Sequence, residues 1–297
     1  MSLISRREAG KLIAAGGAGL LAARGRLAGA AMIDSVIRGV QIGAQSYSFR
    51  DRPLAAAIEA YQAVGLGECE LWQGHLEPDE VKTKREELRR WRLDTALSHF
   101  RSIRQQFDSA GILLYAYNYS FRKDFTDAEI ERGFEMAQAL GVKYITASSH
   151  VSVAPRVDAY AAKYQITVGF HGHDQTSNPD EFSTAETFAR AMRGASRYIG
   201  VNLDIGHFTA AGGHPVEYIR QQHDRIVTLH IKDRKKNHGR NMPFGQGETP
   251  IVEVLRLLRD EQWKIPANIE YEYGKPGMDT IAEVKKCYAY CRRALET

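Results

Sequence analysis

The chain has 297 residues, of which 43% are hydrophobic and 26% charged, a composition that excludes a disordered protein and is ordinary for a globular one. The formal net charge of +4 is spread along the chain and falls once the basic N-terminus is set aside, so charge gives no case for nucleic-acid binding. The three cysteines make a disulfide framework unlikely, and we interpret Cys287 and Cys291 as packing or surface residues.

Residues 1–30 predict a cleavable twin-arginine export signal. Arg6 and Arg7 precede a Gly/Ala-rich run at 13–23, and Ala28-Gly29-Ala30 suits signal peptidase. The run is too short and too rich in glycine to cross a bilayer of about 30 Å as a stable helix. A chance basic amphipathic N-terminus is the alternative. We expect a periplasmic mature protein of residues 31–297 that folds before export and has no membrane association once the signal is removed.

From residue 40 onward, short β-branched or aromatic runs alternate with longer helical patterns, which is typical of repeated βα units. The predicted strands are 40–47, 68–72, 112–117, 143–146, 165–170, 198–203, 226–231 and 265–271. The predicted helices include 54–64, 79–92, 127–140, 183–192, 214–223, 251–259 and 278–295. Eight such units close into a barrel of about 250 residues. We therefore predict a single (β/α)₈ TIM barrel. A doubly wound sheet is the competing fold, but no GxGxxG fingerprint follows any strand.

Titratable side chains fall at or just beyond the carboxyl ends of most predicted strands, where a barrel of this type carries its active site. They are Glu70, His75, His150, His171, His173, Asp204, His207, His230, Asp233, Glu270 and Glu272. Asp204, His230 and Glu270 come from three different strands and form a mixed carboxylate and imidazole set. Such a set suits Mn²⁺, Mg²⁺, Co²⁺ or Zn²⁺, and we predict a divalent cation, with Mn²⁺ first. Taken singly, each also has a structural explanation, as a helix cap, a core histidine or an ion-pair partner.

Strand alternation places further groups on the same faces: His230 with Lys232, Glu270 with Glu272, and His171 with His173. We expect Glu270 to bind the metal and Glu272 to transfer a proton or orient a ligand, although the two glutamates could exchange roles. Lys232 is expected to hold an oxyanion or protonate a leaving oxygen, or else to form an ion pair. His207 is expected to touch a substrate hydroxyl, or else to cap a helix. The basic run 234–240 is interpreted as a solvated loop, with a site for a substrate phosphate or carboxylate as the alternative.

Three motifs carry a family resemblance: Asp204-x-x-His207; His230-x-Lys232-Asp233 with Gly245-Gln246-Gly247 downstream; and Ile269-Glu270-Tyr271-Glu272. With them, about residues 38 to 295 resemble the xylose-isomerase-like TIM-barrel superfamily of sugar isomerases and epimerases. The resemblance implies metal-assisted proton movement next to a sugar carbonyl. It also implies that Asp204, His230 and Glu270 are metal ligands from the sixth, seventh and eighth strands.

The fifth strand departs from the family pattern. Ketose epimerases of the superfamily have a glutamate there that binds metal and exchanges a proton, whereas His171 best matches that position here. An imidazole can bind the metal when neutral, but it changes the charge of the site by one unit. We therefore expect His171 as a fourth ligand and His173 as a catalytic group. Members with His-x-His on this strand resemble inosose dehydratase-like and keto-glycoside-cleaving enzymes, in which a base removes the proton α to a ketone.

The expected function is proton abstraction α to the carbonyl of a sugar or glycoside substrate, followed by isomerisation, epimerisation or β-elimination. Two other functions compete with it. A related endonuclease cuts abasic DNA, but it needs more metal ligands and a basic surface. A barrel without the fifth-strand carboxylate could instead bind sugars without turnover. The substrate, the outcome of the reaction and the oligomeric state stay open at this point.

Overall fold

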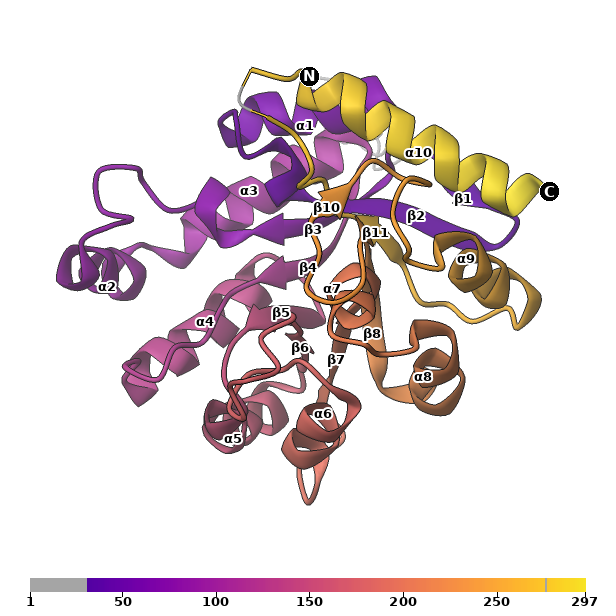
Figure 1. The fold of residues 1–297 in the computed structure, drawn as a ribbon. Coiled ribbons are helices and arrows are strands. Elements are labelled where there is room, and N and C mark those ends of the chain that lie inside the picture. Colours follow the sequence, from indigo (N-terminus) through magenta and orange to yellow (C-terminus); the bar gives the residue numbers. More distant parts are fainter. Residues whose placement is uncertain (1–30, 276) are drawn as a thin grey trace, which may run out of the picture.

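Eight parallel strands form a closed barrel at the centre of the computed structural model, which describes residues 31–275 and 277–297 (Figure 1). They are β2 (Val40–Gln45), β3 (Glu68–Trp72), β4 (Leu113–Asn118), β5 (Tyr144–Ser148), β6 (Thr167–His171), β7 (Ile199–Asp204), β8 (Ile226–Ile231) and β11 (Ala267–Ile269). Each pairs with the next in parallel, and β11 pairs with β2 to close the ring. The predicted barrel is confirmed. The predicted export signal at 1–30 lies outside the described residues.

Strand boundaries differ from the prediction mainly at turns. The fifth barrel strand begins at Thr167 rather than at Gln165, because Gln165 ends the preceding helix in a left-handed conformation with φ 53°. The last barrel strand is shorter than predicted, since only Ala267–Ile269 is paired. A short β1 (Val36–Ile37) adds to β2 through a tight antiparallel hairpin at Arg38 and Gly39, which have φ of 51° and 88°.

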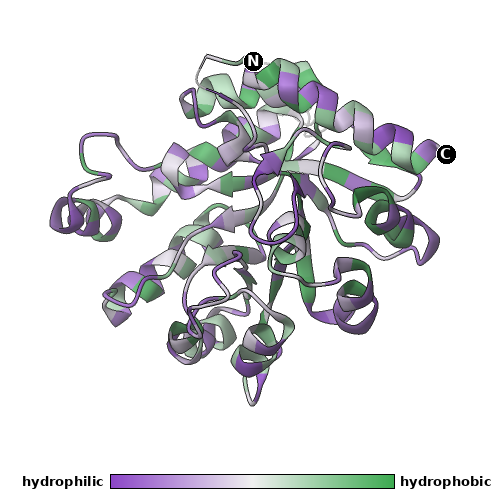
Figure 2. Cartoon of the chain, viewed as in Figure 1, coloured by the Kyte–Doolittle hydropathy of each residue, from purple (hydrophilic) through white to green (hydrophobic). Residues whose placement is uncertain are grey.

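Helices surround the barrel, as Figure 1 shows. They are α1 (Leu54–Val64), α2 (Arg85–Asp94), α3 (Leu97–Ala110), α4 (Asp127–Ala139), α5 (Ala154–Tyr164), α6 (Ala185–Met192), α7 (Ile205–Ala210), α8 (Pro215–Gln222), α9 (Ile251–Asp260) and α10 (Thr280–Glu296). The prediction did not include α3, α5 or the short α7. In α3, Phe100, Ile103 and Phe107 recur at helical spacing and are buried. Figure 2 shows hydrophobic residues along several barrel strands and alternating hydrophobic and hydrophilic residues along the surrounding helices. No helix in the described ranges has the length and apolar character needed to cross a membrane.

The inside of this barrel is unusually polar. TIM-barrel interiors are ordinarily filled by branched apolar side chains. Here Glu68, Glu70, Asn202, Thr228 and Asn268 are all fully buried. Asn268 donates to the Thr228 hydroxyl at 2.9 Å, and Glu68 fits only because Gly43 faces it, where a Cβ would lie 1.7 Å from Glu68 Oε2. The polar groups therefore extend from the barrel interior towards the carboxyl ends of the strands.

The loop after β8 is organised by one carboxylate. Asp233 lies in β9 (Asp233–Arg234), which pairs antiparallel with β10 (Asn241–Met242). Its Oδ2 accepts the backbone N–H groups of Gly245 at 2.8 Å and Gly247 at 2.9 Å. A Cβ on Gly247 would lie 1.9 Å from Asp233 Oδ1, so only glycine permits this approach. The GxG motif of the sequence therefore fixes the loop that follows His230 and Lys232.

Candidate metal centre

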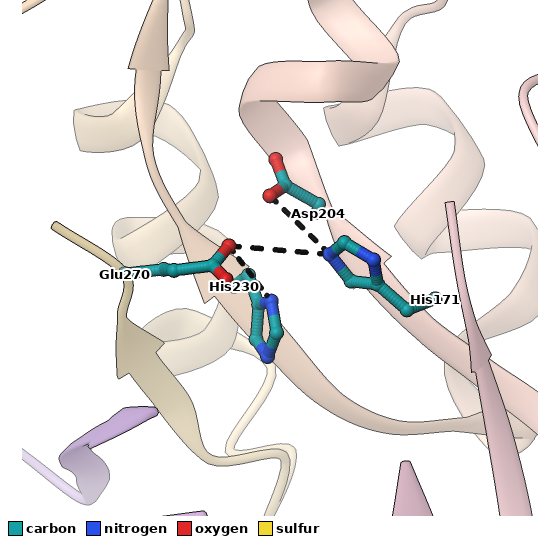
Figure 3. Close-up of side chains that lie close together, drawn as sticks. All are labelled: His171, Asp204, His230 and Glu270. Carbon is teal, nitrogen blue, oxygen red and sulfur yellow. Dashed lines mark hydrogen bonds and ion pairs between the residues drawn. The ribbon is translucent and has the colours of Figure 1, made fainter. Parts of the chain in front are cut away.

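Four side chains from neighbouring strands converge at the carboxyl end of the barrel. They are His171 at the end of β6, Asp204 at the end of β7, His230 in β8 and Glu270 directly after β11. Each offers a ligand atom, and these atoms lie within 4.8 Å of one another with all four residues buried. Figure 3 shows the side chains pointing towards one another. The structure thus brings together all the residues that the sequence analysis predicted as metal ligands.

One carboxylate oxygen of Asp204 caps a helix, and the other faces the cluster of four side chains. It is the N-cap of α7, and its Oδ1 accepts the His207 backbone N–H at 2.7 Å. Its Oδ2 is buried and, among the residues the structure describes, has no hydrogen bond of acceptable geometry, although Lys232 Nζ lies 3.0 Å away. The helix-cap explanation therefore holds for Oδ1, and Oδ2 stays available as a ligand atom, because one carboxylate can use its two oxygens differently.

His171 points one ring nitrogen, Nε2, towards Asp204 Oδ2. Its Nδ1 lies 3.3 Å from the Ser148 hydroxyl, while its Nε2 is buried, has no hydrogen-bond partner within the described ranges and lies 3.5 Å from Asp204 Oδ2. Burial lowers the pKa of His171 to about 3, so the ring is neutral near pH 7. An imidazole nitrogen and a carboxylate oxygen that are buried without a hydrogen bond are costly. A divalent cation would satisfy both atoms.

Two further groups fix the orientation of His230. Its Nε2 lies 2.9 Å from Glu70 Oε2, and its Nδ1 lies 3.1 Å from Glu270 Oε2. Donation from Nε2 to Glu70 leaves Nδ1 facing the cluster, which is how outer carboxylates orient metal-binding histidines. Although burial opposes the charged ring, Glu70 and Glu270 raise the pKa of His230 well above its usual value. A bound cation would replace the proton on Nδ1.

Lys232 supplies a positive charge at the centre of the site. Its Nζ lies 2.7 Å from Glu270 Oε2, 2.7 Å from Glu272 Oε2 and 3.0 Å from Asp204 Oδ2, and its side chain is 2% exposed. Burial favours the neutral amine, but these carboxylates outweigh it and raise the pKa of Lys232. The ion-pair explanation of Lys232 therefore describes this structure, and the residue stays charged beside the cluster.

Glu272 lies beside the cluster rather than within it. Its carboxylate contacts Lys232 and Asn241, at 2.7 Å and 3.4 Å, and its side chain is 24% exposed. Glu270, in contrast, lies within the cluster. Of the two glutamates, Glu270 has the position of a ligand and Glu272 that of a group open to a bound molecule.

His173 and His207 line the entrance to the site. His173 Nδ1 lies 2.9 Å from Glu181 Oε1, which leaves Nε2 as its free nitrogen. His207 lies 3.1 Å from Lys232 Nζ and also contacts Asp174, whose pKa is lowered by the hydrogen bond with His207 and by Arg234. Arg234 is buried and bonded to Asp174 at 3.0 Å. The interpretation of 234–240 as a solvated loop is therefore wrong at Arg234.

A pocket of about 290 Å³ opens onto these groups. It is lined by Gln45, Tyr47, Trp72, Asn118, Ser120, Ser148, His171, His173, His207, His230, Lys232, Glu270 and Glu272. A larger hollow of about 570 Å³ lies against α5 and α6, but none of these groups lines it. We place the candidate site in the smaller pocket because of its chemistry.

Sequence reasoning named Glu70 only as a strand-end residue and missed Glu181 and Asp174. Strand alternation could have indicated Glu70, since an inward-facing glutamate in a buried strand needs a partner. Glu181 lies in an irregular segment, and no periodic signal connects it with His173 eight residues earlier.

Comparisons with known proteins agree with this architecture. The sequence matches the family described as xylose isomerase-like TIM barrel over residues 58–291, and no curated protein matches it. A sugar phosphate isomerase/epimerase from Parabacteroides distasonis superposes with a TM-score of 0.63 at 16% identity, covering 90% of this chain and 99% of that one. The probable 3-DHS dehydratase of Bacillus anthracis gives 0.61 at 14%, covering 84% and 99%. The IolI protein with a bound zinc atom gives a TM-score of 0.60 at 17% identity, covering 86% of this chain and 96% of that one.

At these identities the superpositions show the fold, and the family match covers most of the chain. The chain belongs to the xylose isomerase-like TIM barrel family.

Proposed function

We propose that this protein is a divalent-metal-dependent enzyme that removes the proton α to the carbonyl of a keto-sugar or keto-glycoside. One observation carries the proposal: His171 Nε2 and Asp204 Oδ2, both buried and without a hydrogen bond in the described structure, face one point beside a polar pocket. Two imidazoles and two carboxylates suit Mn²⁺, which we propose first, and also Zn²⁺ or Co²⁺. When bound, the ion would polarise a carbonyl oxygen and stabilise an enolate.

We assign the base to His173. Its Nδ1 is held by Glu181, so Nε2 is available, and 31% of the side chain is exposed to the pocket region. A histidine oriented by a carboxylate is a common general base near neutral pH. Glu272, with 24% exposure, is the second proton-transfer group. Lys232 stays protonated among its carboxylates, so it serves as a hydrogen-bond donor to an oxyanion rather than as a base.

We infer the fate of the enolate from the residue at the end of the fifth barrel strand, His171. With His171 in place of a glutamate, the site lacks the pair of opposed glutamates of the ketose epimerases. We therefore favour proton removal by one group, followed by β-elimination or by reprotonation on the same face. A superposition on a dehydratase structure supports elimination only through the shared fold.

The test is proton exchange in D₂O, followed by NMR with a panel of keto-sugars and 3-keto-glycosides. Metal-loaded protein should exchange the α proton, protein stripped by a chelator should not, and His173→Gln should slow exchange by about 10²-fold or more. Sugar binding without exchange would instead indicate a non-catalytic sugar-binding barrel. Nicking of abasic DNA would indicate the endonuclease function.

We also propose that the protein is exported through Arg6 and Arg7. Arg6→Lys with Arg7→Lys should keep a reporter fused after residue 30 in the cytoplasm, whereas the native leader should release it to the periplasm. Cytoplasmic retention with the native leader would contradict this proposal.

A further inference from the structure

A second hollow of about 410 Å³ adjoins the pocket of about 290 Å³ that opens onto the four clustered side chains. We call the smaller one the metal pocket. The two share Ser120, Ser148 and His173. The rest of its wall consists of Phe121, Arg122, Lys123, Asp124, Ser149, His150 and Glu181. The two hollows therefore lie next to each other, and His173 is one of the residues between them.

The wall of the second hollow is held in place by contacts between its loops. His150 and Glu181 form an isolated antiparallel bridge, and the Val151 N–H donates to Asp180 O at 2.9 Å. Asp180 accepts from Ser152 and pairs with Lys123. The segments 120–124, 148–153 and 173–183 are thus tied together without a ligand, which is the preformed character expected of a binding site.

Two basic side chains of this wall have no ion pair or hydrogen bond within the described residues. Lys123 is paired with Asp180, Asp124 with Arg85, and His173 with Glu181. The Arg122 guanidinium is exposed and has no ion pair or hydrogen bond within residues 31–275 and 277–297. His150 Nδ1 is buried and also lacks a hydrogen-bond partner in those ranges. The wall therefore includes one arginine without an ion pair and one histidine whose Nδ1 has no hydrogen bond in the described ranges.

Size and polarity together indicate the ligand. The metal pocket of about 290 Å³ is at the lower limit of small-molecule sites, which fits one sugar ring. The second hollow is lined mainly by hydroxyl, imidazole and charged groups, with Phe121 as its one aromatic residue. We propose that it binds the second, hydroxylated ring of a two-ring keto-glycoside with at most one negative charge, and that this ring is the leaving group.

The position of His173 suits an elimination that releases the second ring. With one ring at the metal and the other in the second hollow, the oxygen that joins them lies near His173. In an elimination, the C–H bond α to the ketone breaks and its electron pair forms the new C=C bond. The C–O bond to the second ring breaks, and that oxygen takes the proton from the protonated base. The choice of a keto-glycoside rests on the proposed function, whereas the second-ring site itself can be tested by binding alone.

The experiment measures binding to metal-loaded protein by calorimetry. The probes are trehalose and lactose, methyl glucoside as their one-ring counterpart, and the 3-keto form of each. The variants are Arg122→Met and His150→Phe, which keep side-chain bulk and remove the two unpartnered groups. Arg101→Met is the matched control, since Arg101 is an exposed arginine of α3 that lines neither pocket.

We expect at least one two-ring probe to bind about tenfold or more tightly than its one-ring counterpart. Arg122→Met and His150→Phe should each remove most of that difference and leave the one-ring affinity unchanged. Equal affinity for one-ring and two-ring probes, no binding of any two-ring probe, or loss of both affinities in the variants would overturn the second-ring site. Proton exchange in D₂O is measured separately, so a protein that prefers two rings without exchanging protons keeps the site and loses the enzymatic proposal.

Discussion

The Lys232 ammonium lies 2.7 Å from Glu270 Oε2, and both side chains are buried at the carboxyl end of the barrel. Lys232 also reaches Asp204 and Glu272, so one internal cation pairs with three carboxylates. Lys232 therefore stabilises the folded site without a metal, and it will repel a cation bound beside it.

Replacing Lys232 with methionine should separate these two effects. Without metal, Lys232→Met should lower the free energy of unfolding by about 3–5 kcal/mol, because buried charges lose their partner. Mn²⁺ or Zn²⁺ should bind this variant more tightly than the native protein and should restore much of the stability. Urea unfolding with and without metal measures both effects, and Lys236→Met, at an exposed lysine of the same loop, is the control. Unchanged stability of the metal-free variant would contradict the internal-cation interpretation.

The two oxygens of Asp204 can be tested separately. Asp204→Asn retains an oxygen that can cap α7 and loses the charge that faces the cluster, whereas Asp204→Ala loses both. Metal affinity measured by competition with a chelating dye should fall by about 100-fold or more in both variants. The alanine variant should be less stable than the asparagine variant by about 1 kcal/mol, the usual contribution of a helix cap. Metal affinity close to native in Asp204→Asn would exclude Asp204 as a ligand.

Glu70 should affect metal binding without touching the ion. It holds His230 through Nε2 at 2.9 Å, so Glu70→Gln should weaken the orientation and basicity of the ring. We expect metal affinity to fall by about 10–100-fold. Glu68→Gln is the matched control, because Glu68 is equally buried on the same face of β3 but does not contact His230. Equal metal affinities for the two variants would remove the role assigned to Glu70.

Glu68 should make stability depend on pH. Its carboxylate oxygens are buried and have no hydrogen-bond partner in the described structure, and burial raises the pKa of Glu68 well above 4.5. Below its unfolded pKa the carboxyl group is protonated in both states. As pH rises above that value, only the unfolded state ionises, so the native protein loses stability until the folded pKa is reached.

Glu68→Gln should remove this dependence. We expect it to stabilise the protein by about 1–3 kcal/mol at pH 8 and by much less at pH 4.5, as measured by urea unfolding at both pH values. Destabilisation at pH 8 would show that Glu68 is ionised and needed in that form.

The sequence predicted the elements whose signals are local. β8 and β3 were predicted with their observed boundaries. In β8 the signal is a run rich in β-branched and apolar residues, which is typical of a buried strand. The helix Leu54–Val64 was predicted with its observed bounds as well. The predicted helix at 79–92 begins only at Arg85, since residues 79–84 form turns stabilised by bonds to Pro78 and Val81.

The side-chain contacts of the site were harder to predict from the sequence than the helices and strands. Alternation along strands placed His230 with Lys232 and Glu270 with Glu272, but it could not say that Lys232 would pair with both glutamates and Asp204. The contact between His230 and Glu70 joins residues 160 positions apart. Whether residues so far apart in sequence come into contact depends on barrel closure and strand register, which no local pattern encodes.

From the sequence alone came the barrel, the end at which a site would lie, and the residue types able to bind a divalent cation, because each of these follows from periodicity and from side-chain chemistry. Only the tertiary structure decided which atoms share the site: Asp204 uses one oxygen for α7 and presents the other to His171, and Glu70 holds His230 from across the barrel. The physical reason is that coordination and pairing act over about 3 Å, whereas strand alternation specifies only the face on which a side chain lies.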